Sequence, residues 1–205
     1  MTQWVENRTG GRDRGPLAVL RAWVEILLRP WRFFQTGVAP GDQAPGLVFM
    51  AVVVFVEEGS RFAVVALAER GRLSLGPFEY PVIGELAPLM AVLALVAIVV
   101  FVAPAVLHLT AALQTLLLAP LAPDRGGISE TVQVIAYATA PCVFAGVPVP
   151  EVRIACGLWG AGLYCYGMAT IHNISLTRAV VVSLVPASIL FGYGFRGFAA
   201  LGTVL

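Results

Sequence analysis

Long apolar segments alternate with short polar turns along most of the chain. Five segments approach the roughly 20 residues that a helix needs to cross a bilayer core of ~30 Å. They are residues 46–68, 86–107, 131–149, 152–171 and 177–195. The pattern predicts an all-α fold, a polytopic membrane bundle of five transmembrane helices. The second helix is expected to continue through "HLTAALQTLLLA", and Pro104, Pro141 and Pro186 predict kinks.

An amphipathic segment precedes the first predicted span. Arg21, Glu25, Arg29 and Arg32 recur at spacings of four, four and three residues, which places them on one stripe of a helix. The tryptophans Trp23 and Trp31 lie among the surrounding apolar residues. We expect this helix to lie at the membrane interface, with the arginines and tryptophans in contact with lipid headgroups, or to pack its apolar face on the bundle. The two interpretations are compatible.

Three regions follow from this pattern. Residues 1–15 form a polar tail, 16–45 the amphipathic helix and its connector, and 46–205 the five-span membrane domain. The tail lacks the apolar stretch of ~7–15 residues that a secretory signal requires, so we expect an uncleaved amino terminus.

Composition supports a membrane protein and narrows its chemistry. Apolar residues make up 59% of the chain and charged residues 12%, against about 25% charged in a soluble domain. The thirteen basic residues are all arginine, and a net charge of +1 gives no nucleic-acid footprint. Cys142, Cys156 and Cys165 form no CxxC pair, and His108 and His172 lie on separate segments. We therefore expect no disulfide framework, no metal site and no cofactor.

The distribution of arginines predicts the orientation. With a cytoplasmic amino terminus, the inner side carries eight arginines: Arg8, Arg12, Arg14, Arg21, Arg29, Arg32, Arg125 and Arg178. The other side carries four: Arg70, Arg72, Arg153 and Arg196. The positive-inside rule then places the amino terminus in the cytoplasm and the carboxyl terminus outside a multi-pass cell-membrane protein.

Three charged residues interrupt the first predicted span. Glu57, Glu58 and Arg61 lie within "FVEEGSRF", and an unpaired charge at mid-helix costs about 2.5–3.5 kcal/mol on an insertion scale. The spacing allows Arg61 to pair with either glutamate, so the second acid needs another partner, a proton or water. Three interpretations are open: a functional polar centre, an internal ion pair that fixes helix packing, or a span whose ends lie elsewhere so that these charges sit near the membrane interface.

Other motifs carry little chemistry. The sequence contains no HExxH, GxSxG or Walker pattern, so we expect no enzyme of those classes. Small residues in "CGLWGAGLYCYG", among them Gly157, Gly160 and Ala161, are typical of close helix packing.

Several short motifs, in order, resemble the Yip1 family of five-span membrane proteins. They are "LLRPWRFF", "APGLVF", "ETVQVIAYATAP", the "VPVP" turn, "LW", Tyr166-Gly167 and "HNISLTRA", followed by Pro186. The arrangement looks closest to haloarchaeal members. The resemblance implies a five-helix integral membrane protein with a cytoplasmic amino terminus; eukaryotic relatives are linked to small GTPases and vesicle traffic.

Two functions remain open from the sequence. The short loops, the absence of the catalytic motifs named above and the amphipathic helix favour a non-enzymatic membrane scaffold or adaptor. Its expected partners are membrane lipids and other membrane proteins or further copies of itself, and not nucleic acid. The alternative is a small transporter or channel subunit that uses Glu57, Glu58 and Arg61.

Overall fold

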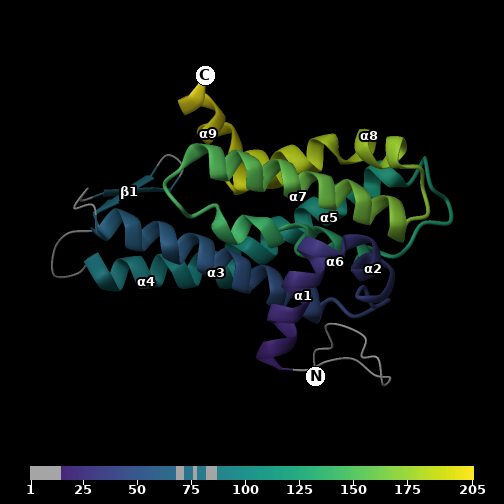
Figure 1. The fold of residues 1–205 in the computed structure, drawn as a ribbon, viewed down its shortest axis with the longest axis horizontal. Coiled ribbons are helices and arrows are strands. Elements are labelled where there is room, and N and C mark those ends of the chain that lie inside the picture. The colour runs from purple at the N-terminus through teal and green to yellow at the C-terminus, as the bar shows by residue number, and fades with distance from the viewer. Residues whose placement is uncertain (1–14, 68–71, 76–77, 82–86) are drawn as a thin grey trace.

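The computed structural model describes residues 15–67, 72–75, 78–81 and 87–205. The predicted polar tail, apart from Gly15, lies outside these residues. Helices make up most of the described chain, as predicted (Figure 1). The elements are α1 (Pro16–Leu28), α2 (Pro30–Thr36), α3 (Ala44–Leu67), β1 (Arg72–Leu75), β2 (Phe78–Pro81), α4 (Ala87–Ala97), η1 (Ile98–Val102), α5 (Ala103–Leu118), α6 (Ile128–Ala138), η2 (Ala140–Phe144), α7 (Pro150–Ile171), α8 (Leu176–Ala187), η3 (Ser188–Gly194) and α9 (Gly197–Val204).

Three helical stretches among the described residues are long and apolar enough to cross a membrane. They are Pro88–Leu118, Pro150–Ile171 and Leu176–Gly194, and they correspond to the second, fourth and fifth predicted spans. The first of them runs on to Leu118, as "HLTAALQTLLLA" predicts. Helix α3 has 24 residues, enough to span, but carries three charges in its carboxyl-terminal half. A five-span membrane topology therefore stays a prediction.

The third predicted span is not one continuous α-helix. Helix α6 ends at Ala138, and the 3₁₀ turn η2 follows from Ala140. Pro141, at the start of η2, has no backbone N–H and its ring disfavours a regular α-helix across this point. The kink expected at Pro141 is thus a change of helix type, and residues 145–149 form turns instead of continuing the helix.

Proline also accompanies a π-helical segment in the second span. Pro104 follows η1, which is π-helical, and the carbonyl four residues before it, that of Val100, belongs to η1. Because proline cannot donate to that carbonyl, the ladder widens locally. A second π-helical segment, η3, follows Pro186 in α8.

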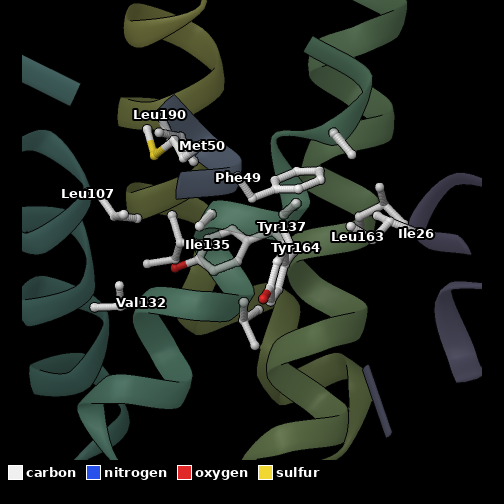
Figure 2. Close-up of a cluster of buried hydrophobic side chains, with 14 of the residues drawn as sticks. Ile26, Phe49, Met50, Leu107, Val132, Ile135, Tyr137, Leu163, Tyr164 and Leu190 are labelled. Atoms are coloured by element: carbon white, nitrogen blue, oxygen red, sulfur yellow. The ribbon is translucent and has the colours of Figure 1, made fainter. Parts of the chain in front are cut away.

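The core of the bundle is built around α6 and η2. Every residue from 131 to 142 is buried, and α3, α5 and α7 pack around this segment. The ring of Tyr137 packs edge-on against Phe33 and Phe49, with centroid distances of 4.8 Å and 5.3 Å. Figure 2 shows Tyr137, Tyr164, Ile135 and Phe49 among the buried side chains of this core.

In contrast to this buried core, the amino-terminal half of the helical stretch Pro88–Leu118 has its side chains on the outside of the protein. No residue from 88 to 102 is buried, although the stretch is almost wholly apolar. Helix α4 lies alongside α3 at one end of the molecule (Figure 1). An outward apolar surface of this kind suits a lipid environment.

The amphipathic segment forms two helices in place of one. Helix α1 ends at Leu28, and Arg29, with φ −140°, separates it from α2. Ala18, Ala22 and Ile26 face the bundle, whereas Leu17 and Leu20 are exposed. Helix α1 runs across the long direction of the bundle (Figure 1), so the segment packs on the protein with one face and leaves another apolar face outward.

A short hairpin was not predicted. Strands β1 and β2 pair antiparallel, with Arg72 opposite Pro81 and Leu75 opposite Phe78. The all-helical prediction missed it because two four-residue strands leave little periodicity to detect.

Candidate functional site

The three charged residues of α3 are buried inside the protein. Glu57, Glu58 and Arg61 retain 2%, 4% and 9% of their accessible surface. Ionised side chains are almost never buried to this degree without partners. Their surroundings therefore bear on the three interpretations that the sequence left open.

Glu58 pairs with Arg61 one helical turn further along, which is one of the two pairings that the spacing allows. The Arg61 Nε–H donates to Glu58 Oε2 at 2.8 Å, and the Arg61 Nη2 also contacts this oxygen. The Arg61 guanidinium additionally lies 5.0 Å from the centroid of the Phe62 ring. One glutamate of the pair thus has its partner on the same helix.

Glu57 finds its partner 139 residues away in the sequence. Arg196, between η3 and α9, donates from Nη1 to Glu57 Oε1 at 3.0 Å and from Nη2 to Glu58 Oε1. We call Glu57, Glu58, Arg61 and Arg196 the ionic cluster. The arginine distribution placed Arg196 on the outer side, after the fifth predicted span, and did not predict this pairing. The one signal in the sequence was that a single arginine could not satisfy two glutamates.

Backbone geometry brings Arg196 to the cluster. Arg196 has φ 58° and ψ 28°, the left-handed conformation that non-glycine residues adopt uncommonly. It immediately precedes α9 and turns the chain so that α9 packs along α7. The unusual dihedral angles thus accompany a turn that aims the guanidinium back at α3.

A glycine lets the segment before α7 approach the ionic cluster closely. A Cβ atom on Gly146 would lie 2.0 Å from Ser60 Oγ and 2.2 Å from the Glu57 carbonyl oxygen. The neighbouring Ala145 carbonyl accepts from Arg153 Nε–H at 2.9 Å. The cluster therefore lies beside the first residues of α7 and the last residues of η3.

The opposite charges of the ionic cluster neutralise one another. Two carboxylates face two guanidiniums, and each carboxylate accepts at least one charge-assisted hydrogen bond. Removing one partner of such a buried set costs about 3–5 kcal/mol because a charge is left uncompensated. The arrangement ties α3 to the carboxyl-terminal segment.

A second set of polar side chains is buried without ion pairs. The Tyr164 hydroxyl of α7 donates to Gln114 Oε1 of α5 at 2.6 Å, and both residues are fully buried. The Thr131 hydroxyl and His172 Nε2 lie 3.2 Å apart, joining the start of α6 to the end of α7. We call Gln114, Tyr164, Thr131 and His172 the neutral set.

His172 is held in its uncharged form. Burial lowers the pKa of its imidazole to about 4, while Glu130 acts in the opposite direction and Arg125 adds to the decrease. Its Nδ1 atom has no hydrogen-bond partner among the described residues. A proton added there would thus be buried without an acceptor.

The predicted lipid-contact residues separate into two groups. Arg21, Arg29 and Trp31 are exposed. Arg32 pairs with Glu25 at 3.2 Å, and the Trp23 indole N–H donates to the Ala140 carbonyl at 2.8 Å. Trp23 therefore directs its polar atom into the protein and not toward a headgroup.

The small residues of α7 lie at helix contacts to different degrees. A Cβ on Gly160 would come within 2.4 Å of the Phe191 ring and 3.0 Å of the Ala138 carbonyl oxygen, so no side chain fits there. At Gly157 the nearest Phe191 atom is 3.8 Å away, which leaves room. Ala161 is partly buried against the core.

Among the described residues, no three histidine, cysteine, aspartate or glutamate side chains are grouped to hold a metal ion, and the three cysteines are free thiols. His108 is exposed and contacts Gln43, with His108 Nε2 3.1 Å from Gln43 Oε1, whereas His172 is buried beside Thr131. The two histidines thus belong to different parts of the bundle.

Apolar outward helices around a buried, internally neutralised polar core define an α-helical protein of the membrane class. A sequence model of the Yip1 domain matches residues 24–195. The chain therefore belongs to the Yip1 family. The match ends one residue before Arg196, so it covers three of the four residues of the ionic cluster. Neither the curated proteins nor the solved structures that were searched contain a match.

Proposed function

We propose that this Yip1-family protein is a non-enzymatic scaffold or adaptor of the membrane, which binds membrane partners or organises lipid. The observation that carries the proposal is the pairing of both Glu57 and Glu58 with arginines. Carboxylates engaged in this way fix the packing of helices. The charges in α3 are then part of the frame on which a binding surface is built.

The outer surface supplies the second support. Residues 88–102 of α4 and η1 are apolar and unburied, and α8 presents further exposed apolar residues, among them Val181, Leu184 and Val185. In a bilayer such faces contact lipid tails or the helices of other membrane proteins. Lipids, other membrane proteins and further copies of this chain are the proposed partners, and nucleic acid is not.

The proposed topology is a multi-pass protein of the cell membrane with its amino terminus in the cytoplasm and its carboxyl terminus outside. It rests on the arginine distribution in the sequence. Helix α1, whose exposed residues include Leu17, Leu20 and Arg21, fits an interfacial position across the bundle. An archaeal source is an expectation from the sequence motifs alone.

The test is purification of the full chain from its source membrane in a mild detergent, followed by mass spectrometry of what remains bound. A protein present in stoichiometric amount supports the scaffold. The control is the same purification from a membrane that lacks the chain. If both preparations contain the same background proteins in equal amounts, the chain was recovered alone, and this result contradicts the adaptor role.

A second candidate is a transporter or channel subunit centred on the same cluster. It is favoured by the Arg196 side chain, which is 24% exposed and leaves one edge of the cluster accessible. Ion flux into vesicles containing purified protein should then disappear in Glu57→Gln/Glu58→Gln. Flux that is absent from the wild type, or unchanged in the variant, rules this candidate out.

A further inference from the structure

Three buried polar side chains meet between the three helical stretches that are long and apolar enough to cross a membrane. Gln114 belongs to the first of these stretches, Tyr164 to the second and Ser183 to the third, and none of the three residues is exposed. The Tyr164 hydroxyl donates to Gln114 Oε1 at 2.6 Å, and the Ser183 hydroxyl lies close to the Tyr164 hydroxyl. Helix α8 packs against both α5 and α7. The three stretches thus bring one polar side chain each to a common place.

The hydrogen bonding of these side chains is incomplete. Within the described part of the chain, Gln114 Nε2 and Ser183 Oγ have no hydrogen-bond partner. Serine inside a helix often donates to the carbonyl four residues earlier, here that of Ala179, but the Ser183 hydroxyl does not. Two amide N–H donors and one hydroxyl are therefore buried and unpaired. Such groups are costly to bury because folding removes the water that solvates them in the unfolded chain.

Rotation of the Gln114 amide does not complete the hydrogen bonding. If its nitrogen faced Tyr164, the Tyr164 O–H would meet an N–H group in place of its acceptor, so the rotation exchanges one unpaired group for another. The Ser183 hydroxyl is unpaired in either orientation. The missing partner is therefore a further molecule and not another arrangement of the same three side chains.

The chemistry of the three side chains defines that molecule. Glutamine, tyrosine and serine are uncharged at neutral pH, so they offer no counter-charge to a buried ion. The partner must accept from an amide N–H and also bond to hydroxyl groups, which water does, and buried waters make about three hydrogen bonds each. Pro186 adds a polar atom nearby, because it leaves the Val182 carbonyl without the N–H donor that a regular α-helix supplies.

We propose that Gln114, Tyr164 and Ser183 bind one buried water molecule between the three candidate membrane spans. The water accepts from the Gln114 Nε2–H and bonds to the oxygens of Ser183 and Tyr164. It thereby joins α8 to the hydrogen bond between α5 and α7, in a place where a bilayer offers no bulk water as a substitute. The water site is independent of the proposed function, since a scaffold and a transporter would hold it equally.

A structure of the full chain at a resolution that shows ordered water tests the site directly. The wild type should contain a density peak about 2.7–3.2 Å from both Gln114 Nε2 and Ser183 Oγ. The peak should be absent from Gln114→Leu, whose side chain has no donor. Absence of the peak from the wild type, or its persistence in Gln114→Leu, overturns the proposal.

Thermal unfolding of the purified full chain in detergent provides a second readout. Ser183→Ala should lower the melting temperature by about 2–4 °C, because the water loses a partner. Ser188→Ala is the matched control, since Ser188 is exposed on the same helical stretch, and it should behave as the wild type. In a Gln114→Leu background the effect of Ser183→Ala should fall by at least half, because the water is already lost.

The same measurement contains the results that contradict the site. A rise in melting temperature in Ser183→Ala would mean that the hydroxyl is buried without any partner. A full effect of Ser183→Ala in Gln114→Leu, together with its disappearance in Tyr164→Phe, would assign the hydroxyl to a direct bond with Tyr164. An equal loss in Ser188→Ala would remove the effect from this site. If Gln114→Leu does not fold, the density in the wild type decides.

Discussion

Two sets of polar side chains are buried in this bundle, and they satisfy their polar atoms in different ways. The ionic cluster concentrates four charges at the junction of α3, α7 and the carboxyl-terminal segment, where every carboxylate meets a guanidinium. The neutral set is dispersed between α5, α6 and α7 and depends on single hydrogen bonds. Charge permits strong coupling between distant segments but makes the loss of one partner severe, whereas neutral contacts are weak and individually dispensable.

The largest expected effect comes from breaking the cluster at Arg196. Arg196→Met removes the guanidinium that contacts both Glu57 and Glu58, so we expect a loss of about 3–5 kcal/mol in the free energy of unfolding. Reversible unfolding by denaturing detergent in mixed micelles measures it.

Arg178→Met is the matched control, since the Arg178 side chain is exposed at the start of α8. It should change the free energy of unfolding by less than about 0.5 kcal/mol. Equal effects of the two substitutions would mean that the ionic cluster does not hold the carboxyl-terminal segment to α3.

The same contrast explains what the sequence could predict. The pair of Glu58 with Arg61 is one of the two pairings that the spacing on one helix allows, and the bounds of α7, and of α8 together with η3, follow from continuous apolar runs. The partnership of Glu57 with Arg196 joins positions 139 residues apart, and no local period encodes such a contact. The need for a glycine at position 146 is likewise visible only in the folded protein, where α3 packs directly against it.

The break after α6 illustrates a different difficulty. Pro141 signalled an irregularity, but the apolar run from 131 to 149 is equally compatible with a kinked span and with a buried helix that ends early. Tertiary packing decides, because α3, α5 and α7 enclose this segment and bury every residue from 131 to 142. Hydrophobicity alone cannot distinguish burial in lipid from burial in protein.

Lowering the pH should have an intermediate effect on the free energy of unfolding, through His172 in the neutral set. Its pKa in the folded protein, about 4, lies below the ordinary value of 6.5. As pH falls from 6.5 toward 4 the unfolded chain therefore binds a proton that the folded protein does not. The folded state should lose at most about 3 kcal/mol over this interval.

The measurement is the free energy of unfolding at several pH values for the wild type and for His172→Gln. The difference between the two should change with pH and level off above pH 6.5, because both forms are then uncharged at this position. Glu130 and Arg125 are present in both proteins, so the comparison isolates the residue at position 172. A constant difference from pH 7 to pH 4 would contradict the neutral burial of His172.

The smallest expected effect comes from the Tyr164 hydroxyl. Hydrogen bonds between helices in membrane proteins contribute about 0.6 kcal/mol on average, so Tyr164→Phe should cost about 0.5–1.5 kcal/mol, several times less than Arg196→Met. Tyr193→Phe, at a 74% exposed position, is the control and should be close to neutral.

A double-mutant cycle with Gln114→Leu isolates the contact itself. Because the 2.6 Å bond joins Tyr164 directly to Gln114, the double variant should lose less than the sum of the two single variants, by about 0.6 kcal/mol. Strict additivity would mean that the two side chains do not interact in the folded protein. A coupling as large as that of a buried ion pair would erase the distinction between the neutral set and the ionic cluster, since a single neutral hydrogen bond would then hold two helices as firmly as charge does.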